Sequence, residues 1–242
     1  MDREAYLKQE LQTIGIEVTE QQVQQFMKYY DMVLQKNTVM NLTAITEYTE
    51  FVKKHFVDSL MIFRTRKPEA GMRMIDIGTG AGFPGVPIKI VYPEVSMVLL
   101  DSLNKRVLFL QDVIRELGLQ DIIAIHERAE GPAHKVDYRE TFDICVSRAV
   151  ANLTTLVEYC LPYVKKSGEF ISYKSGKITD ELSNAEYAIK VLGGAVDVVD
   201  SFELPGSDME RTLIHIKKIK QTPKKYPRSA GKPSKEPLHF NE

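Results

Sequence analysis

The chain has 242 residues, 43% of them hydrophobic, and its 32 Lys and Arg against 33 Asp and Glu leave a net charge of −1. This length fits one large domain or a main domain with a small companion, and no apolar run approaches the ~18 residues of a membrane span. The first residues lack the apolar core of a signal peptide, and two cysteines in apolar surroundings indicate neither a disulfide framework nor a zinc site, so we expect a cytoplasmic protein.

The charge is unevenly spread along the chain. Residues 217–235 contain eight Lys and Arg and no Asp or Glu, so the other 24 basic side chains stand against all 33 acidic ones. Either a frayed, solubilising terminus or contact with a polyanion explains a basic segment on an acidic body. Residues 222–242, rich in Pro, Lys and Ser, show no periodicity and are predicted to be a basic tail.

Residues 1–66 are predicted to form a small helical layer against the main domain. One amphipathic helix is expected over 4–14. A second opens with the capping-box pattern Thr19-Glu-Gln-Gln22 and fades at Asn37, with its aromatic side chains in the core. Two short helical stretches then reach Phe63.

From Arg73 onward strands and helices alternate, which predicts an α/β fold with a mostly parallel sheet. Strands are expected at 74–77, 96–100, 122–126, 142–147, 169–174, 195–204 and 211–219, with helices from near Pro84 and over 103–117, 152–164 and 179–192. The last two strands are joined by a turn, and we expect them to form an antiparallel hairpin. Nicotinamide-binding sheets are mostly parallel throughout, whereas sheets that bind S-adenosylmethionine usually end in such a hairpin. The sheet domain is predicted to span 67–221.

A glycine loop follows the first strand and fits two patterns. Asp76-Ile-Gly-Thr-Gly-Ala-Gly82 matches the acid-x-Gly-x-Gly-x-Gly of S-adenosylmethionine sites, and Gly80-Ala-Gly-Phe-Pro-Gly85 matches the dinucleotide fingerprint. A carboxylate at Asp76 would repel a pyrophosphate but attract an ammonium and a sulfonium. Pro84 lacks an N–H that could donate to a phosphate. The loop therefore favours the methyl donor, with expected contacts at Asp76, Gly78, Gly80 and Gly82.

The ends of the next strands supply further candidates. Asp101 can accept hydrogen bonds from ribose hydroxyls or can merely cap the next helix, for which Ser102 has the better geometry, and we expect both residues among the cofactor contacts. Ala129 and Glu130 would flank the adenine, although Glu130 fits a solvated loop acid equally well. Arg148 could anchor the cofactor carboxylate, hold a guanine O6 or a phosphate, or form a surface salt bridge.

Absent motifs constrain the chemistry. No Asn-Pro-Pro-Tyr-like motif of amino-group methyltransferases follows the fourth strand, and Cys145 lies inside that strand rather than presented as a nucleophile. The five histidines are scattered, so no metal site is indicated. A target that is already nucleophilic, such as a ring nitrogen, needs alignment and exclusion of water but no general base. We therefore expect no acid, base or nucleophile among the side chains.

Several motifs together resemble the bacterial 16S rRNA guanine-N7 methyltransferase G family, historically called glucose-inhibited division protein B. They are Asp76-Ile-Gly-Thr-Gly-Ala-Gly-Phe-Pro-Gly-Val-Pro87, Asp101-Ser-Leu-Asn-Lys-Arg-Val107, Ser147-Arg-Ala149, Asn41-Leu-Thr43, His55-Phe-Val-Asp-Ser-Leu60 and Thr222-Pro-Lys-Lys-Tyr-Pro-Arg-Ser229. The resemblance covers nearly the whole chain. It implies a Rossmann-like class I methyltransferase with a seven-stranded sheet. The implied reaction is methyl transfer from S-adenosyl-L-methionine to N7 of a guanine in a decoding-region loop of small-subunit rRNA.

The resemblance also assigns residues. It places cofactor contacts at Gly78, Phe83, Ala129, Glu130 and Arg148, and functional positive charges at Arg128, Arg148, Lys174 and Arg211. We expect the charges to hold phosphates or a guanine turned out of its stack. In the tail, Lys224, Lys225 and Arg228 would extend this track, with Tyr226 available for stacking.

Three alternatives stay open from the residues alone. A small-molecule methyltransferase would use the same cofactor, and a ribosome-assembly factor could bind RNA with a retained pocket. A nicotinamide oxidoreductase is the more distant third. For the leading interpretation we expect a monomer acting on 16S rRNA or the small ribosomal subunit, with no membrane and no metal.

Overall fold

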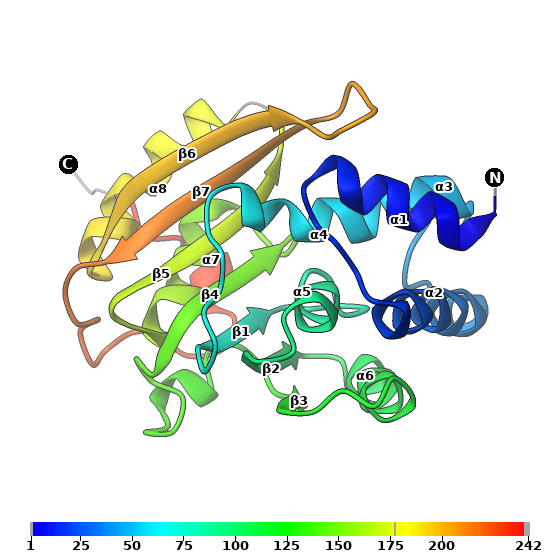
Figure 1. The fold of residues 1–242 in the computed structure, drawn as a ribbon. Coiled ribbons are helices and arrows are strands. Elements are labelled where there is room, and N and C mark those ends of the chain that lie inside the picture. Colours follow the sequence, from blue (N-terminus) through cyan, green and yellow to red (C-terminus); the bar gives the residue numbers. More distant parts are fainter. Residues whose placement is uncertain (1, 177, 240–242) are drawn as a thin grey trace.

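A seven-stranded sheet in the order β3-β2-β1-β4-β5-β7-β6 forms the centre of the computed structural model, which describes residues 2–176 and 178–239 (Figure 1). Its strands are β1 (Arg73–Ile77), β2 (Ser96–Asp101), β3 (Ile122–His126), β4 (Phe142–Arg148), β5 (Val164–Ser175), β6 (Gly194–Glu203) and β7 (Glu210–Lys218). Only the pairings of β7 with β5 and β6 are antiparallel. The predicted fold class is confirmed, and β5 starts earlier than predicted because Val164 pairs with Phe142 before a register shift.

Helices cover both faces of the sheet (Figure 1). The helices are α1 (Arg3–Thr13), α2 (Glu20–Met40), α3 (Tyr48–Phe51), α4 (Asp58–Leu60), α5 (Gly85–Val91), α6 (Asn104–Glu116), α7 (Leu153–Cys160), α8 (Thr179–Val191) and α9 (Lys232–Lys235). Tighter 3-10 turns are η2 (Met61–Arg64), η3 (Pro132–His134) and η4 (Leu161–Tyr163), and η1 (Val52–Val57) is a π-helical turn. Helices α7 and α8 pack on one face, while α5, α6 and the N-terminal helices share the core of the other.

The N-terminal helical layer has no separate core. Val23, Phe26 and Tyr29 of α2 belong to the same buried cluster as Val86 of α5 and Leu99 of β2. The predicted capping box at the start of α2 is present, and the aromatic side chains lie in the core as expected. The helix runs past the predicted end to Met40 and ends there because the next residue, Asn41, adopts the left-handed conformation. The layer therefore contributes directly to the face of the sheet that carries the glycine loop.

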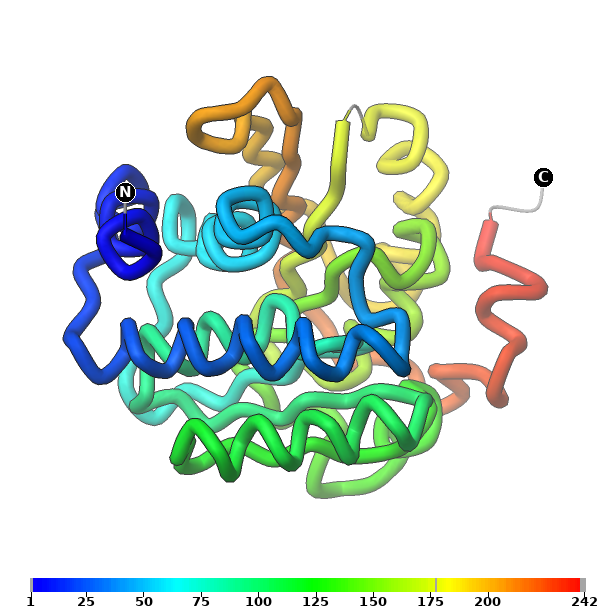
Figure 2. The backbone as a smooth tube through the Cα atoms, turned by 90° about the vertical axis from the view of Figure 1, so that its right-hand side faces the viewer, coloured from blue at the N-terminus to red at the C-terminus, as the bar shows by residue number. Residues whose placement is uncertain are grey.

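The C-terminal segment, predicted as an aperiodic tail, packs along the sheet domain on the side away from the N-terminal helices (Figure 2). Arg139 donates hydrogen bonds to the carbonyls of Thr222, Pro223 and Tyr226 at 2.8–3.3 Å. Tyr226 is buried, so the prediction that its ring stacks on a base is wrong.

Candidate functional site

The glycine loop connects β1 to α5 at the carboxyl edge of the sheet, where parallel α/β sheets bind ligands. Gly78 (φ +71°) and Gly80 (φ +63°) adopt the left-handed conformation that favours glycine. A Cβ at Gly78 would lie 2.4 Å from Cγ2 of Val150. The loop after β4 therefore lies directly against the glycine backbone, and no side chain fits between them.

Asp76 lies beneath this loop and is fully buried. Its Oδ2 accepts hydrogen bonds from the Thr79 hydroxyl at 2.7 Å and the Gly85 N–H at 2.9 Å, which fixes the loop. Its Oδ1 has no hydrogen-bond partner among the described residues. Burial raises the pKa of Asp76 to about 6. An unpaired, buried carboxylate oxygen fits a cationic ligand group, because a positive charge would stabilise its ionised form.

Asp101 organises the same region. Its Oδ2 accepts a hydrogen bond from the Gly80 N–H and its Oδ1 one from the Leu103 N–H, both at 2.9 Å. The guanidinium of Arg106 lies 3.6 Å from Oδ2. The carboxylate thus has the local structural role that the sequence left open, and ribose hydroxyls would have to use its remaining lone pairs.

A cavity of about 240 Å³ opens beside the glycine loop. It is lined by Ile77, Gly78, Leu100, Ser102, Glu127, Arg128, Ala129, Val150, Ala151, Tyr159 and Ser234. This volume is below the range of about 300–1,000 Å³ for a whole drug-sized ligand, so the cavity suits one end of a larger molecule.

The structure places the predicted cofactor residues in two groups. Gly78, Ser102 and Ala129 line this cavity, as does Arg128, but the other predicted contacts do not. A Cβ on Gly82 would meet the Tyr29 hydroxyl at 2.6 Å, so Gly82 allows close packing of the helical layer. Phe83 is buried in the same layer, and the carboxylate of Glu130 points to the C-terminal segment, where it accepts a hydrogen bond from the Gly231 N–H at 2.7 Å.

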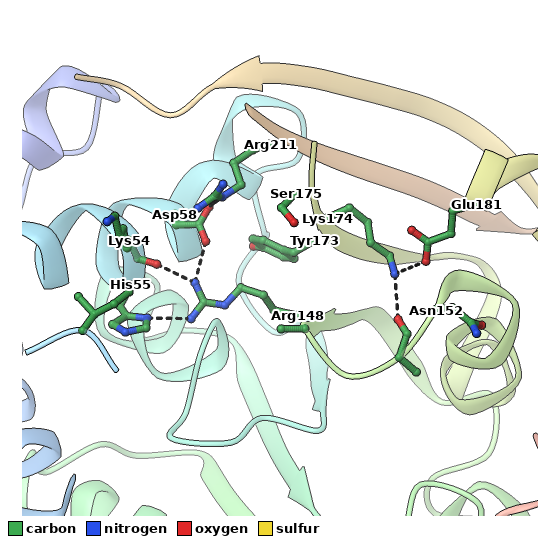
Figure 3. A pocket seen from close by; sticks show the side chains of 13 residues that line it. Lys54, His55, Asp58, Arg148, Asn152, Tyr173, Lys174, Ser175, Glu181 and Arg211 are labelled. Carbon is green, nitrogen blue, oxygen red and sulfur yellow. Dashed lines mark hydrogen bonds and ion pairs between the residues drawn. The ribbon is translucent and has the colours of Figure 1, made fainter. Parts of the chain in front are cut away.

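A second cavity, of about 550 Å³, lies on the other side of the loop after β4. Figure 3 shows the side chains around it, which come from two separate parts of the chain, residues 45–58 and 148–211. It is lined by Ile45, Lys54, His55, Asp58, Arg148, Ala149, Ala151, Asn152, Tyr173, Lys174, Ser175, Glu181 and Arg211. Ala151 lines both cavities, so residues 149–151 form the partition between them.

Asp58 joins two arginines in this second cavity (Figure 3). Its Oδ2 lies 2.8 Å from Nη1 of Arg148, and its Oδ1 lies 2.9 Å from Nε of Arg211. Arg148 also donates to the carbonyl of Lys54 at 3.1 Å, within the π-helical turn η1. π-helical turns occur frequently at functional sites. Arg148 therefore faces the second cavity and does not reach out as a free anchor for a cofactor carboxylate.

His55 is neutral and orientated. Its Nδ1 lies 3.2 Å from Nη2 of Arg148 and its Nε2 lies 2.8 Å from the Thr43 hydroxyl. Because a guanidinium only donates, Nδ1 accepts and Nε2 carries the proton. Burial and the Arg148 charge lower the pKa of His55 to about 3. Its ring stacks on Phe83 with centroids 4.5 Å apart, so Phe83 supports this cluster from the glycine loop.

Lys174 holds the partition loop. Its Nζ donates to the carbonyl of Ala151 at 2.9 Å and to Oε1 of Glu181 at 2.6 Å. The same Glu181 oxygen accepts the Leu153 N–H at 2.6 Å. Lys174 thus lines the second cavity, and its contacts fix the backbone between the two cavities.

The other cationic side chains that were predicted to contact RNA differ in their exposure. Lys224 and Lys225 are exposed, and Arg128 is 59% exposed at the edge of the first cavity. Arg228 instead pairs with the buried carboxylate of Glu158 at 2.7 Å. Its guanidinium is therefore engaged inside the protein, which contradicts its expected place in an RNA-contacting track.

Sequence reasoning missed several residues of the second cavity. Asp58 and His55 occur in a motif that carried the family resemblance, but no pattern indicated their partners. Glu181 lies in an ordinary amphipathic helix and gave no signal. Lys54 was equally unmarked, and its contribution is a backbone carbonyl, which any residue can supply.

Other chemistry finds no support in the described residues. Cys145 is fully buried in β4, as expected for an apolar packing role. Within residues 2–176 and 178–239 no cluster of His, Cys, Asp or Glu could hold a metal ion. No described helix has the length and hydropathy to cross a membrane.

Comparisons with known proteins show which family this chain resembles. A family model described as rRNA small subunit methyltransferase G matches residues 22–214. A protein named Ribosomal RNA small subunit methyltransferase G from Lachnoclostridium phytofermentans is 55% identical over 230 residues, 95% of each chain. One of the same name from Alkaliphilus oremlandii is 51% identical over 238 residues, 98% of this chain and 100% of the relative.

Solved structures share the fold at low sequence identity. TYW2 of M. jannaschii in complex with AdoMet superposes with a TM-score of 0.54 at 11% identity, covering 73% of this chain and 80% of that one. The YcgJ protein from Bacillus subtilis has a TM-score of 0.52 at 15% identity, covering 69% of this chain and 100% of that one. These likenesses support the class I methyltransferase fold.

Proposed function

We infer that this chain, which belongs to the rRNA small subunit methyltransferase G family, methylates N7 of a guanine in 16S rRNA. Methyl transfer from S-adenosyl-L-methionine to 16S rRNA is the activity of an enzyme of this family and fold. The choice of guanine and of N7 is our proposal, and it follows the motif resemblance described above.

The observation that carries the proposal is the pair of adjoining cavities. One opens beside the glycine loop and the other is lined by four cationic and two acidic side chains, with only residues 149–151 between them. A methyl donor in the first cavity and a base from a polyanion in the second would meet at this partition. Holding two reactants in line is the main task left to an enzyme whose acceptor is already nucleophilic.

The residues around the first cavity fit S-adenosylmethionine. Gly78, Ser102 and Ala129 line this cavity beside Glu127 and Arg128, and the unpaired Oδ1 of Asp76, which is buried beneath the glycine loop and is not part of the cavity wall, suits an ammonium. When bound, the cofactor supplies an electrophilic methyl group on a sulfonium. We propose that Asp76 and the loop backbone orient its methionine end, while Ser102 and Ala129 contact the adenosine.

The second cavity suits a guanine that reacts through N7. Arg148 and Arg211 provide N–H donors that could pair with O6, and the neutral His55 has its one proton directed to Thr43. No proton is removed from N7, because its lone pair forms the new bond. The absence of a poised base among the described cavity residues is therefore consistent with the reaction.

Cationic side chains around the two cavities and on the C-terminal segment would hold the surrounding RNA. Arg128 at the first cavity, Lys174 and Arg211 at the second, and Lys224 and Lys225 on the C-terminal segment are proposed to contact phosphates. We propose 16S rRNA or the small subunit as the partner, a monomeric enzyme, and action in the cytoplasm, where its substrate is found.

The test is transfer of labelled methyl groups onto small-subunit rRNA from a strain that lacks this protein, followed by mapping of the modified base. We expect one m7G, with a binding salt slope of roughly −0.7 per contacted phosphate on single-stranded RNA. Arg211→Gln should lower transfer without changing S-adenosylmethionine affinity. Incorporation at an atom other than N7, or into no ribosomal particle, would overturn the proposal.

A further inference from the structure

The C-terminal segment reaches the rim of the cofactor cavity. Ser234 in α9 lines that cavity together with Tyr159 of α7 and with residues at the ends of β2 and β3. The C-terminal segment runs along one side of the molecule, away from the N-terminal helices (Figure 2). The basic segment is thus part of a ligand site that its sequence gave no reason to associate with it.

A buried ion pair anchors this segment. Glu158 of α7 is 1% exposed, and its carboxylate faces Arg228 with contacts of 2.7–3.2 Å to Nε and Nη2. The backbone N–H of Arg228 donates to the same carboxylate at 2.8 Å. A buried carboxylate without its partner is strongly unfavourable, so this contact keeps the chain at α7.

A second anchor connects the segment to the loop after β3. The Gly231 N–H donates to Oε1 of Glu130, which is 4% exposed. Gly231 has φ +81°, a conformation that turns the chain at this point and favours glycine. Ala129, the residue before Glu130, lines the cavity, and its carbonyl accepts a hydrogen bond from the Tyr163 hydroxyl at 2.5 Å. Glu130 is therefore placed to fix the loop from behind.

We propose that residues 228–234 form the adenosine-side wall of the cofactor site. Ser234 is the residue of this wall that touches the ligand, and Arg228 and Glu130 are positioning residues that act through Glu158 and the loop at Ala129. The proposal rests on the cofactor assigned above but not on the identity of the RNA target, so it can fail or succeed independently of it.

The test measures ligand binding by calorimetry without RNA. The ligands are S-adenosylmethionine, S-adenosylhomocysteine and 5′-methylthioadenosine, which all carry the adenosine. Ser234→Phe should weaken all three by roughly tenfold or more, whereas Lys235→Phe, the same change at the next exposed residue, should leave them within about twofold. Arg228→Ala should also weaken all three, with Lys232→Ala as its matched control.

Folding is checked separately by thermal unfolding of each variant. If Arg228→Ala does not yield a folded protein, Glu158→Gln, which keeps the shape and removes one charge, takes its place. Equal weakening of the three ligands by the wall variants, with folded protein, supports the wall. Wild-type affinity of Ser234→Phe for all three ligands would overturn it, as would equal losses in the Lys235→Phe control.

Discussion

Replacing Asp76 with Asn tests whether the buried carboxylate binds the cofactor's ammonium. Asn keeps the shape and an oxygen that can accept the Gly85 N–H, so the glycine loop should persist. It removes the charge from the oxygen that has no partner among the described residues. A hydrogen bond to a charged group contributes about 1.5–3 kcal/mol, so S-adenosylmethionine affinity should fall roughly 10- to 100-fold.

The assay is calorimetric titration at neutral pH with three ligands that differ at one end. S-Adenosylmethionine and S-adenosylhomocysteine both carry the ammonium, and 5′-methylthioadenosine lacks the amino acid. We expect the first two to weaken and the third to bind unchanged. Because Val150 lies against Gly78, we also expect the partition loop to withdraw when the methionine end enters.

The pattern of losses decides the matter. Weakening of S-adenosylmethionine alone would place the sulfonium beside Asp76 in place of the ammonium. Unchanged affinity for all three ligands would refute the reasoning from the unpaired oxygen. Equal weakening of all three would mean that the substitution disturbs the loop as a whole, and it would refute the specific contact as well.

Three further predictions concern stability and the second cavity. Burial raises the pKa of Asp76 from 3.8 to about 6, so the folded state holds this proton more tightly than the unfolded state does. The free energy of unfolding of the cofactor-free protein should therefore fall by up to ~3 kcal/mol as the pH rises through this window. Urea unfolding should show this dependence on pH in the wild type and not in Asp76→Asn. Gly78→Ala should lower the free energy of unfolding by about 1–2 kcal/mol because of the positive φ of this residue alone. The new Cβ would also clash with Val150, and adding Val150→Ala should restore only the part of the loss that this clash causes, as measured by denaturant midpoints. Asp58→Asn should reduce rRNA methylation at least about tenfold, because Arg148 and Arg211 lose the carboxylate that they share. Calorimetry should find the affinity for the cofactor unchanged. Equal losses of methylation and of cofactor affinity would contradict two separate cavities.

Local sequence patterns predicted the sheet and the position of the glycine loop because period, glycine spacing and caps are properties of neighbouring residues. The same patterns located Asp76 but not its environment, since its burial depends on the loop folding back over it. Arg148 was found, yet its partner was not, because Asp58 is 90 residues away in the chain.

The C-terminal segment illustrates the same limit. Its composition predicted a basic tail, and Lys224 and Lys225 are exposed. Arg228 has the same charge but faces Glu158, 70 residues earlier in the chain. Charge can be counted from sequence, whereas the direction of a side chain depends on which buried acid the fold brings beside it.

The position of β7 has a consequence for biosynthesis. This strand lies between β5 and β6 although it is made after both. A nascent chain that ends before residue 210 has an open edge on β5 and no strand against which β6 can pair, and it also lacks Arg211. Open edges invite association with other chains. The enzyme therefore completes its second cavity only when the last strand inserts, so that a truncated or partly synthesised chain would have neither the full seven-stranded sheet nor an assembled second cavity.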